Sequence, residues 1–534
     1  MVTFPTPQSF IYSNFKGIRT RNGVNTGGQI SAIVCQNVDF IPNTVGSDIQ
    51  IKSTLGNVLV AQYPDFSLIK GFETEQDGTK HLLVYAENET KGILLEYNTI
   101  DDVFEVIQDD LLVTGQANGI TMKDTAYDVF VFTNGKDYYS VNFATTPITQ
   151  VINPVYNDEK VTGLALAEKD GSLVVGQQEG FGLVIGSRQG DIYDWDYAVT
   201  ADDKTKAWYQ LFGKGVTAIV QYIGGLLVFT KNDSTMLSGN PADLSSFERK
   251  DSSLGGCMSF ESWCQHDKYI FFYDDEQKNV YYYTQIDTGQ KLLGEPIAPE
   301  VQKYFKDVKK LQMVSYIGEN RSEIWLLADK FKLIYDYFVG EWSERVCQDI
   351  TSYFVYDNAV YSTTPKQEII QENGDILKID GKILKEKEGA DSCKFDGVFY
   401  PAVYTMQTIN LGSYSNMKEM EMQPLFTVSD DNDNEFVIDC LIDGKKTKSK
   451  KVQLIVKGGI WGDDSDEITP ECQFDVAVFG AGSDNITHQL KGKFVSNWYY
   501  LQFTIRTEEL GQEFNILAME LKGITMETDT IGRK

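Results

Sequence analysis

The stretch VFVFTNGKDYYSVNF, residues 129–143, contains two short apolar runs separated by a turn. Both runs are rich in β-branched and aromatic residues, which favour strands. The Asn134-Gly135 pair between them supplies the positive φ angles that a tight hairpin needs. The stretch therefore predicts an antiparallel β-hairpin.

The same unit recurs along the first three quarters of the chain. Equivalent apolar runs begin at Leu82, Val129, Leu173, Leu226, Tyr269, Ile324 and Tyr353. Five of the spacings between these starts lie between 43 and 55 residues, and the last is 29. A period of roughly 40 to 50 residues holding several short strands is typical of a propeller blade. We predict an all-β chain with a β-propeller of six to eight blades; a large sandwich or barrel of irregular hairpins is the alternative.

From about Ala390 onward, strongly polar segments separate the apolar runs. They are the basic run KKTKSKK (445–451) and the acidic stretches SDDNDNE (429–435) and GDDSDE (462–467), which we interpret as solvated hairpin tips. This pattern favours a separate β-sandwich-like domain. The predicted organisation is an N-terminal arm with strands (1–60), a propeller (61–390) and a C-terminal platform domain (391–534). Helix is sparse, and the best candidate spans Glu300 to Gln312.

The composition excludes several classes of protein. The 534 residues include 77 Asp and Glu against 48 Lys and Arg, a net charge of −29, which is too acidic for a general nucleic-acid binder. A hydrophobic fraction of 42% and an aromatic fraction of 12% provide a large core, which a disordered acidic tail would lack. No apolar run approaches the roughly 18 residues of a membrane span, and the N-terminus has no secretory pattern. We expect no membrane-spanning segment.

Residues suited to catalysis or metal binding are scarce. The chain has three histidines and seven cysteines, with no C-x-x-C pair, so the cysteines are predicted to be buried thiols. Cys257, Cys264 and His266 lie close in sequence, but their spacing matches no common zinc site. We interpret them as two buried thiols and one surface imidazole. The acidic run 430–435 resembles a calcium loop but lacks the glycine of its sharp turn.

The sequence also contains no clear motif for nucleotide binding or for sugar hydrolysis. Neither a phosphate-binding G-x-x-x-x-G-K-[ST] nor a dinucleotide-binding G-x-G-x-x-G is present. The segment SRQGDIYDW (187–195) partly resembles a turn of sialidase-type propellers, but it departs at the Asp and Gly positions. We interpret it as an ordinary blade turn with Trp195 in the core. The prediction is a protein with no catalytic, cofactor-binding or metal-binding residues, not an enzyme.

Two segments carry a resemblance to a known family. Between Gly224 and Thr284, a strand ending in Phe229-Thr230 leads to a short strand, a glycine-rich crossing at Gly255-Gly256 and an apolar strand with a Tyr-rich partner. This order resembles the tail nozzle proteins of short-tailed bacteriophages, also called tail tubular protein B-like or tail stabilisation proteins. The C-terminal segment Lys491 to Glu527 is similar to the last strands of that family.

The resemblance implies a structural virion protein. Such a protein has a propeller and a platform domain, and assembles as a homo-oligomeric ring, usually a hexamer. The ring lies beneath the portal and adaptor proteins and contacts tail fibres or other tail proteins. The phage genome passes through its lumen without specific binding. The expected location is the virion tail, assembled in the host cytoplasm.

The acidic charge fits such a conduit, because each phosphate contact would add affinity and slow the passage of DNA. Two other hypotheses remain open. One is a propeller lectin or glycosidase acting on surface glycans, motivated by the fold and the many carboxylates. The other is a scaffold propeller that binds proteins through its loops.

Overall fold

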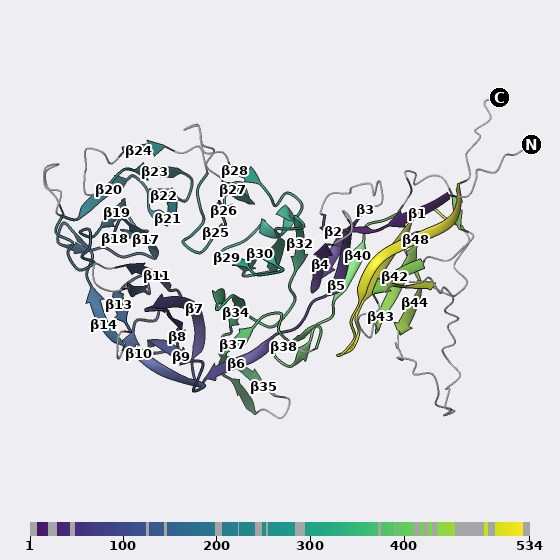
Figure 1. Cartoon of the computed structure of the whole chain (residues 1–534), viewed down its shortest axis with the longest axis horizontal. Helices are drawn as coiled ribbons and strands as arrows, with labels where there is room; N and C mark the ends of the chain where they lie inside the picture. Colours follow the sequence, from purple (N-terminus) through teal and green to yellow (C-terminus); the bar gives the residue numbers. More distant parts are fainter. Residues whose placement is uncertain are drawn as a thin grey trace, which may run out of the picture. The chain divides into compact units, whose positions relative to one another are not determined.

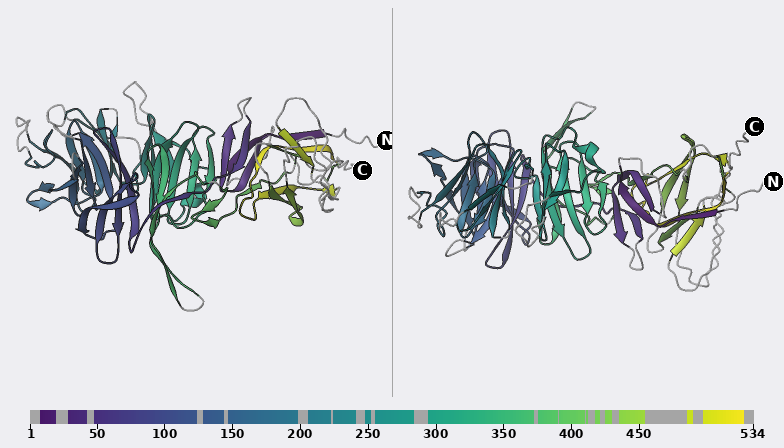
Figure 2. Two further views of the ribbon diagram at one scale, coloured as in Figure 1. Left: turned by 60° about the horizontal axis from the view of Figure 1, so that its bottom comes forward. Right: turned by 90° about the horizontal axis from the view of Figure 1, so that it is seen from above.

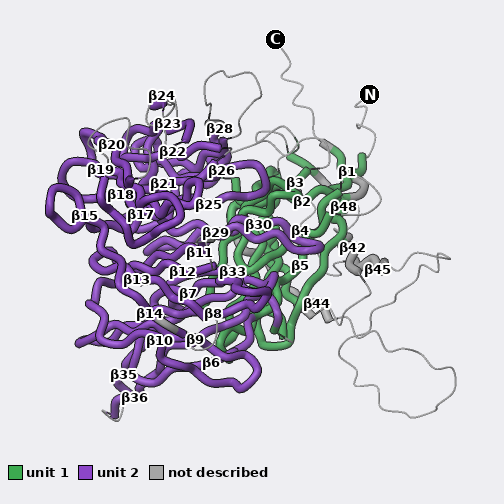
Figure 3. Tube along the Cα trace, turned by 60° about the vertical axis from the view of Figure 1, so that its left-hand side comes forward, with its two compact units in different colours: residues 1–56, 335–347, 389–534 green, residues 57–334, 348–388 purple. Residues whose placement is uncertain are grey.

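The structure of the chain is a computed structural model, which divides into two compact units. Unit 1 contains residues 1–56, 335–347 and 389–534, and unit 2 contains residues 57–334 and 348–388 (Figure 3). The residues described are 8–19, 29–42, 48–123, 128–143, 147–197, 206–222, 224–240, 248–251, 255–283, 294–371, 375–389, 391–409, 411, 417–420, 425–429, 435–453, 485–489 and 497–526.

Unit 2 is a β-propeller, as the repeat predicts, and its four-stranded blades follow one another in a ring (Figure 1). The first blade consists of β7 (Ser67–Gln76), β8 (Thr79–Glu87), β9 (Gly92–Asn98) and β10 (Val103–Leu111). The second consists of β11 (Asn118–Lys123), β12 (Asp128–Thr133), β13 (Tyr138–Asn142) and β14 (Ile148–Ile152). The next two are β17 (Ala165–Lys169), β18 (Ser172–Gly176), β19 (Gly182–Gly186) and β20 (Trp208–Phe212), and β21 (Val216–Tyr222), β22 (Gly225–Thr230), β23 (Ser234–Ser238) and β24 (Glu248–Asp251).

The fifth blade is β25 (Trp263–His266), β26 (Tyr269–Asp274), β27 (Asn279–Tyr283) and β28 (Gly294–Pro296). The sixth four-stranded blade is β33 (Ser352–Tyr356), β34 (Ala359–Thr363), β37 (Gly381–Lys385) and β6 (Val58–Tyr63). Between these two blades lies the antiparallel pair β29 (Leu311–Ile317) and β30 (Ser322–Ala328), followed by β31 (Lys332–Asp336). Strand β29 contacts β25 on one side and β33 on the other, so it completes the circle of inner strands.

The ring closes through strands from opposite ends of unit 2. Strand β6 opens the unit, yet it pairs antiparallel with β37, near its end, and forms the outer strand of the last blade. The blade cores lie between neighbouring sheets. One such core joins Val131 of β12 and Leu173 of β18. Burial on both faces explains why the repeated runs are continuously apolar instead of alternating.

The irregular last spacing of the repeat also has a structural reason. The six runs that begin between Leu82 and Ile324 each lie in the second strand of their repeat, namely β8, β12, β18, β22, β26 and β30. Tyr353 instead lies in β33, the first strand of its blade. The interval of 29 residues therefore joins a second strand to a first strand.

The predicted helix from Glu300 to Gln312 was wrong. Only a single 3-10 turn, η1 (Gln302–Phe305), forms there, and β29 begins at Leu311. The apolar face that suggested a helix is nevertheless buried, with Val301 and Phe305 fully inaccessible. The inner strand β29 begins at Leu311, so the end of the predicted helix is part of a strand.

Unit 1 is a β-sandwich-like domain. One set of paired strands joins β4 (Val38–Pro42), β5 (Ile49–Ser53), β48 (Asn515–Met526), β42 (Leu425–Ser429) and β45 (Asn485–Gln489); β48 also pairs with β1 (Gln8–Tyr12). The other joins β2 (Asn14–Ile18), β3 (Gln29–Gln36), β40 (Val403–Met406), β47 (Leu501–Arg506), β43 (Glu435–Ile442) and β44 (Lys445–Gln453). The ring of Phe426 on β42 packs edge-on against Phe503 on β47, with the ring centroids 5.9 Å apart. Such aromatic pairs typically have centroids about 4.5 to 7 Å apart.

Smaller strands complete unit 1. They are β32 (Glu341–Glu344), β38 (Lys394–Phe395), β39 (Val398–Phe399), β41 (Lys418–Met420) and β46 (Asn497–Trp498). Within this unit the carboxylate of Glu341 accepts hydrogen bonds from the Gly17 backbone N–H and from Arg19. Figure 2 shows the strands of both units in two further views.

The basic run 445–451 is not a hairpin tip, which corrects its interpretation from sequence. Its backbone forms β44, in antiparallel register with β43, and the turn lies before it at Asp443-Gly444, where both φ angles are positive. The acidic residues 430–434 and 462–467 lie outside the described residues. No helix among the described residues is long and apolar enough to cross a membrane.

Candidate functional site

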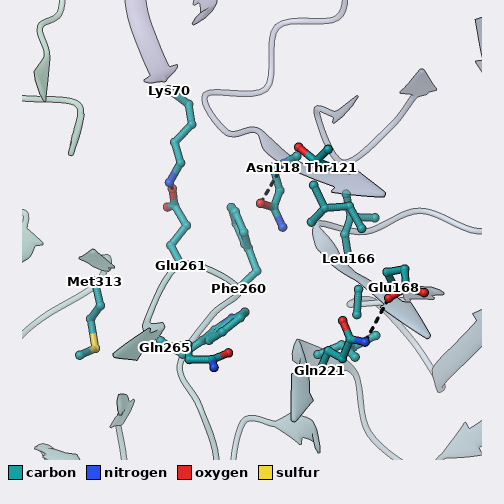
Figure 4. Close-up of a pocket in the computed structure, with 15 residues that line it drawn as sticks. Lys70, Asn118, Thr121, Leu166, Glu168, Gln221, Phe260, Glu261, Gln265 and Met313 are labelled. Atoms are coloured by element: carbon teal, nitrogen blue, oxygen red, sulfur yellow. Dashed lines mark hydrogen bonds and ion pairs between the residues drawn. The ribbon is translucent and has the colours of Figure 1, made fainter. Parts of the chain in front are cut away.

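The inner strands of the propeller surround a cavity of about 420 Å³ (Figure 4). Its lining comes from β7, β11, β17, β21, β25, β29 and the turn before β25. These six strands belong to different parts of the sequence, so their arrangement in a ring assembles the site. The residues that matter for its chemistry are Lys70, Thr121, Glu168, Gln221, Phe260, Glu261, Trp263 and Gln265.

A buried ion pair forms one side of the cavity. Lys70 Nζ lies 2.7 Å from Glu261 Oε1, and the more exposed Lys310 lies 3.7 Å from the other carboxylate oxygen. The Glu261 side chain is only 8% exposed. Burial by itself raises the pKa of this carboxyl, but the two ammonium groups outweigh burial and hold the pKa below its ordinary value. Glu261 is therefore an anion that neutralises Lys70.

A second polar pair lies on the opposite side in Figure 4. Gln221 Nε2 donates a hydrogen bond of 3.0 Å to Glu168 Oε2, while the other oxygen of Glu168 accepts from the Gly171 backbone N–H. Thr121 exchanges a hydrogen bond with Thr74 of the neighbouring blade. Each of these polar side chains thus has a protein partner, so the cavity wall is internally hydrogen-bonded.

Close packing of the strands fixes this wall. Gly119 on β11 faces the ring of Phe130, and a Cβ at this position would lie 2.3 Å from that ring. Asn118 beside it is anchored by donating a hydrogen bond of 2.7 Å to the Leu164 backbone oxygen. A larger residue at position 119 would displace the aromatic ring or the strand.

Sequence reasoning missed the residues that line the cavity. Lys70 and Glu261 are 191 positions apart, so only ring closure brings them together. Polar residues within otherwise apolar strands could have indicated the cavity. Examples are Glu168 in ALAEK and Gln221 in VTAIVQY. Such a residue must point into the channel or find a buried partner.

The structure gives Cys257, Cys264 and His266 structural roles. Cys257 Sγ contacts the Ser262 hydroxyl at 3.2 Å, and His266 bonds to two other serines. His266 is buried, not at the surface as the sequence suggested, and its two ring nitrogens contact Ser315 Oγ at 2.9 Å and Ser322 Oγ at 2.7 Å. Burial lowers the His266 pKa, against a smaller opposing effect of Asp267. Cys257 and Cys264 are buried, and burial raises the pKa of Cys257 to about 12.

The remaining sequence candidates have structural roles. Trp195 is 4% exposed and belongs to the core between two blades, as predicted. The segment 187–195 follows β19, and its turn is held by hydrogen bonds between Arg188 and both Asp191 and Asp194. Six cysteines in the described part of the chain are buried thiols, and Cys472 lies outside it.

Comparisons with known proteins give no family for the chain. No family model and no curated protein matches it. Among solved structures, the extracellular domain of BT4673 from B. thetaiotaomicron aligns with 12% identity and a TM-score of 0.40, over 79% of this chain and 50% of that domain. In a second structure named for BT4673 the alignment covers 42% of that chain. This chain thus spans about half the length of those matches.

Two further structures align at similar levels. The N-terminal domain of Nup159 matches at 10% identity and a TM-score of 0.33, over 66% of this chain and 98% of that one. A luciferin-regenerating enzyme matches at 10% identity and a TM-score of 0.32, over 62% and 95%. These likenesses are too weak to argue from, and the propeller is established by the strand pairing itself. The resemblance to tail nozzle proteins stays a prediction.

Proposed function

We propose that this protein is a structural scaffold that acts by binding other protein chains through the outside of its propeller. The observation that carries the proposal is the distribution of exposed apolar side chains in unit 2. Many of them gather on two neighbouring blades, the first and the last. Soluble monomers rarely expose apolar residues in groups, so such a group favours an interaction surface.

We call this surface the closure rim. It consists of the outer strands β6 and β10 and the hairpin of β35 (Gln367–Ile370) and β36 (Ile376–Ile379), which emerges between β34 and β37. Phe104 of β10 packs against Tyr63 of β6, with ring centroids 5.3 Å apart, so the two outer strands are neighbours. The exposed residues of the rim are Val58, Leu59, Val103, Val106, Ile369, Ile370, Ile376 and Leu377.

The cavity supports the same proposal, because its carboxylates are poorly suited to catalysis. Its carboxylates, Glu168 and Glu261, are already bonded to protein groups, and Glu261 is further held as an anion between two lysines. A general acid or base needs a pKa near the working pH and a free path to its substrate. The geometry therefore favours binding at the surface over chemistry in the channel.

A ring-shaped tail nozzle is the specific scaffold that the sequence resemblance implies. The segment 224–284 that carries it supplies most of two adjacent blades, β21–β24 and β25–β28. A net charge of −29 per chain would keep DNA from adhering to the wall of such a ring. The nozzle remains the narrower form of the proposal, and it is tested separately from scaffolding.

Electron microscopy of the full-length chain, alone and within the particle that contains it, tests both levels. The scaffold proposal expects the chain to assemble with itself or with other proteins. The nozzle form expects a closed ring whose lumen admits a DNA duplex. A chain that stays monomeric and joins no assembly contradicts both, and an assembly without a lumen contradicts only the nozzle.

The cavity also favours a second candidate, a binding site for a small neutral glycan. Phe260 and Trp263 offer aromatic faces, and Gln221 and Gln265 offer amides beside them. Aromatic faces with a few polar groups are a common lining of ligand pockets. Binding of a monosaccharide that is lost in Trp263→Ala, but kept in a variant of the closure rim such as Ile370→Asp, would establish this function; a glycan screen without binding would remove it.

A further inference from the structure

The hairpin β35–β36 carries apolar residues on both of its faces. Its register pairs Ile369 with Leu377 and Ile370 with Ile376. Because successive side chains of a strand point to opposite faces, the first pair lies on one face and the second pair on the other. All four side chains are exposed, from 45% for Ile369 to 75% for Ile370.

This hairpin is held firmly at its base and projects from the blade (Figure 2, left). At the base the Thr364 and Lys382 segments are hydrogen-bonded, and the Lys366 backbone N–H donates to Ser67 Oγ at 2.9 Å. Beyond the base, β35 and β36 form a two-stranded sheet that pairs with no other described strand. An isolated two-stranded hairpin is marginally stable in water, so both edges and both faces need a partner.

A lipid bilayer does not fit as the occupant, because the sequence that joins the two strands of the hairpin is polar. The turn sequence is QENGD, residues 371–375, with two carboxylates. To bury Ile370 and Ile376 in lipid, the hairpin would first have to carry these charges into the hydrocarbon region. Another β-strand satisfies the open edges and covers the apolar faces without that cost.

The charges on the two edges specify which strand fits. Glu368 lies on β35 and Lys378 lies opposite it on β36, with 3.9 Å between Oε1 and Nζ. Pairing β35 with β35 of a second copy would bring glutamates together, and pairing β36 with β36 would bring lysines together. Pairing β35 of one copy with β36 of the next places Glu368 beside Lys378, which is the favourable arrangement.

We propose that copies of this chain join by adding hairpins edge to edge, β35 of one copy pairing with β36 of the next. Such a contact is heterologous, because each copy uses two different surfaces, and it repeats until a rotation closes it into a ring. Closure leaves no free strand edge and continues the apolar rows across each junction. The inference rests on the proposed scaffold function and names its partner as a second copy of the chain.

Single cysteines at the two charged positions test the pairing in the full-length chain. The variants are Glu368→Cys and Lys378→Cys, and the six described native cysteines are buried and do not compete. Under mild oxidation, a mixture of the two variants should yield a mixed disulfide dimer that neither variant yields alone. Asp101→Cys mixed with Lys231→Cys, both exposed on other turns, is the matched control and should yield none.

Charge reversal gives an independent readout by native mass spectrometry. Glu368→Lys should weaken assembly roughly tenfold, and the double variant Glu368→Lys/Lys378→Glu should restore it, because each junction again pairs opposite charges. Cross-linking of Glu368→Cys with itself, or assembled chains without any mixed disulfide, would overturn hairpin pairing and leave the scaffold function intact. A chain that stays monomeric and yields no mixed disulfide would overturn both.

Discussion

At the scale of single residues, the wall of the propeller cavity contains a buried ion pair between Lys70 and Glu261. Lys70 and Glu261 are largely buried and lie 2.7 Å apart, and the more exposed Lys310 is a second partner of Glu261. Removing Glu261 leaves the Lys70 ammonium buried without this carboxylate, which costs more than the pair itself contributes. The pair therefore holds the channel wall together without needing to act on a ligand.

We expect Glu261→Gln to lower the free energy of unfolding by about 3 kcal/mol, as measured by denaturant titration. The matched control is Asp233→Asn, which removes the partner of Lys214 in a pair that is more than half exposed. That change should cost less than about 1 kcal/mol. Equal effects of the two substitutions would contradict the role given to the channel pair.

His266 gives a prediction with a defined pH dependence. Burial lowers its folded-state pKa below the ordinary value of 6.5, so the unfolded chain takes up the proton first. The contribution of this residue to stability is therefore present above pH 6.5 and is lost as the pH falls below it. Urea titrations of wild type and His266→Gln between pH 7.5 and about 5 check this. The wild type should lose more stability on acidification than the variant, and parallel curves would show that His266 does not titrate in this way.

At the scale of elements, local pairing was predictable and distant pairing was not. The hairpins at Val129 and Tyr269 follow from apolar runs joined by short turns, and both formed. The pairing of β6 with β37 spans more than three hundred residues and leaves no local trace. The charge of the run 445–451 predicts a hairpin tip, because charged runs usually lie in loops, whereas its backbone pairs with β43 along its length.

The inner strand β11 offers a test of packing around the cavity. Gly119→Ala adds a methyl group 2.3 Å from the Phe130 ring and should destabilise the protein by about 1 to 3 kcal/mol. Gly213→Ala is the matched control, since its added Cβ meets nothing within 4 Å and its φ angle is not positive. Thermal unfolding should separate the two variants, and an unchanged midpoint for Gly119→Ala would show that the ring adjusts freely.

At the scale of the whole molecule, composition and period predicted the fold class, but not the exposed apolar residues of the closure rim. The sequence predicts six to eight blades, and the structure has six four-stranded blades with β29 and β30 between two of them. The closure rim could not be foreseen, because Ile369 and Ile370 look like core residues until the strand around them is found to be exposed.

Sedimentation of the full-length chain over a range of concentrations tests whether this propeller is a scaffold that binds protein chains. We expect species heavier than the 60.2 kDa monomer. These species should be lost in the double variant Ile370→Asp/Leu377→Asp, which places charge on both faces of the hairpin. A wild-type chain that sediments as a monomer at every concentration, and binds no other protein, would contradict the scaffold function.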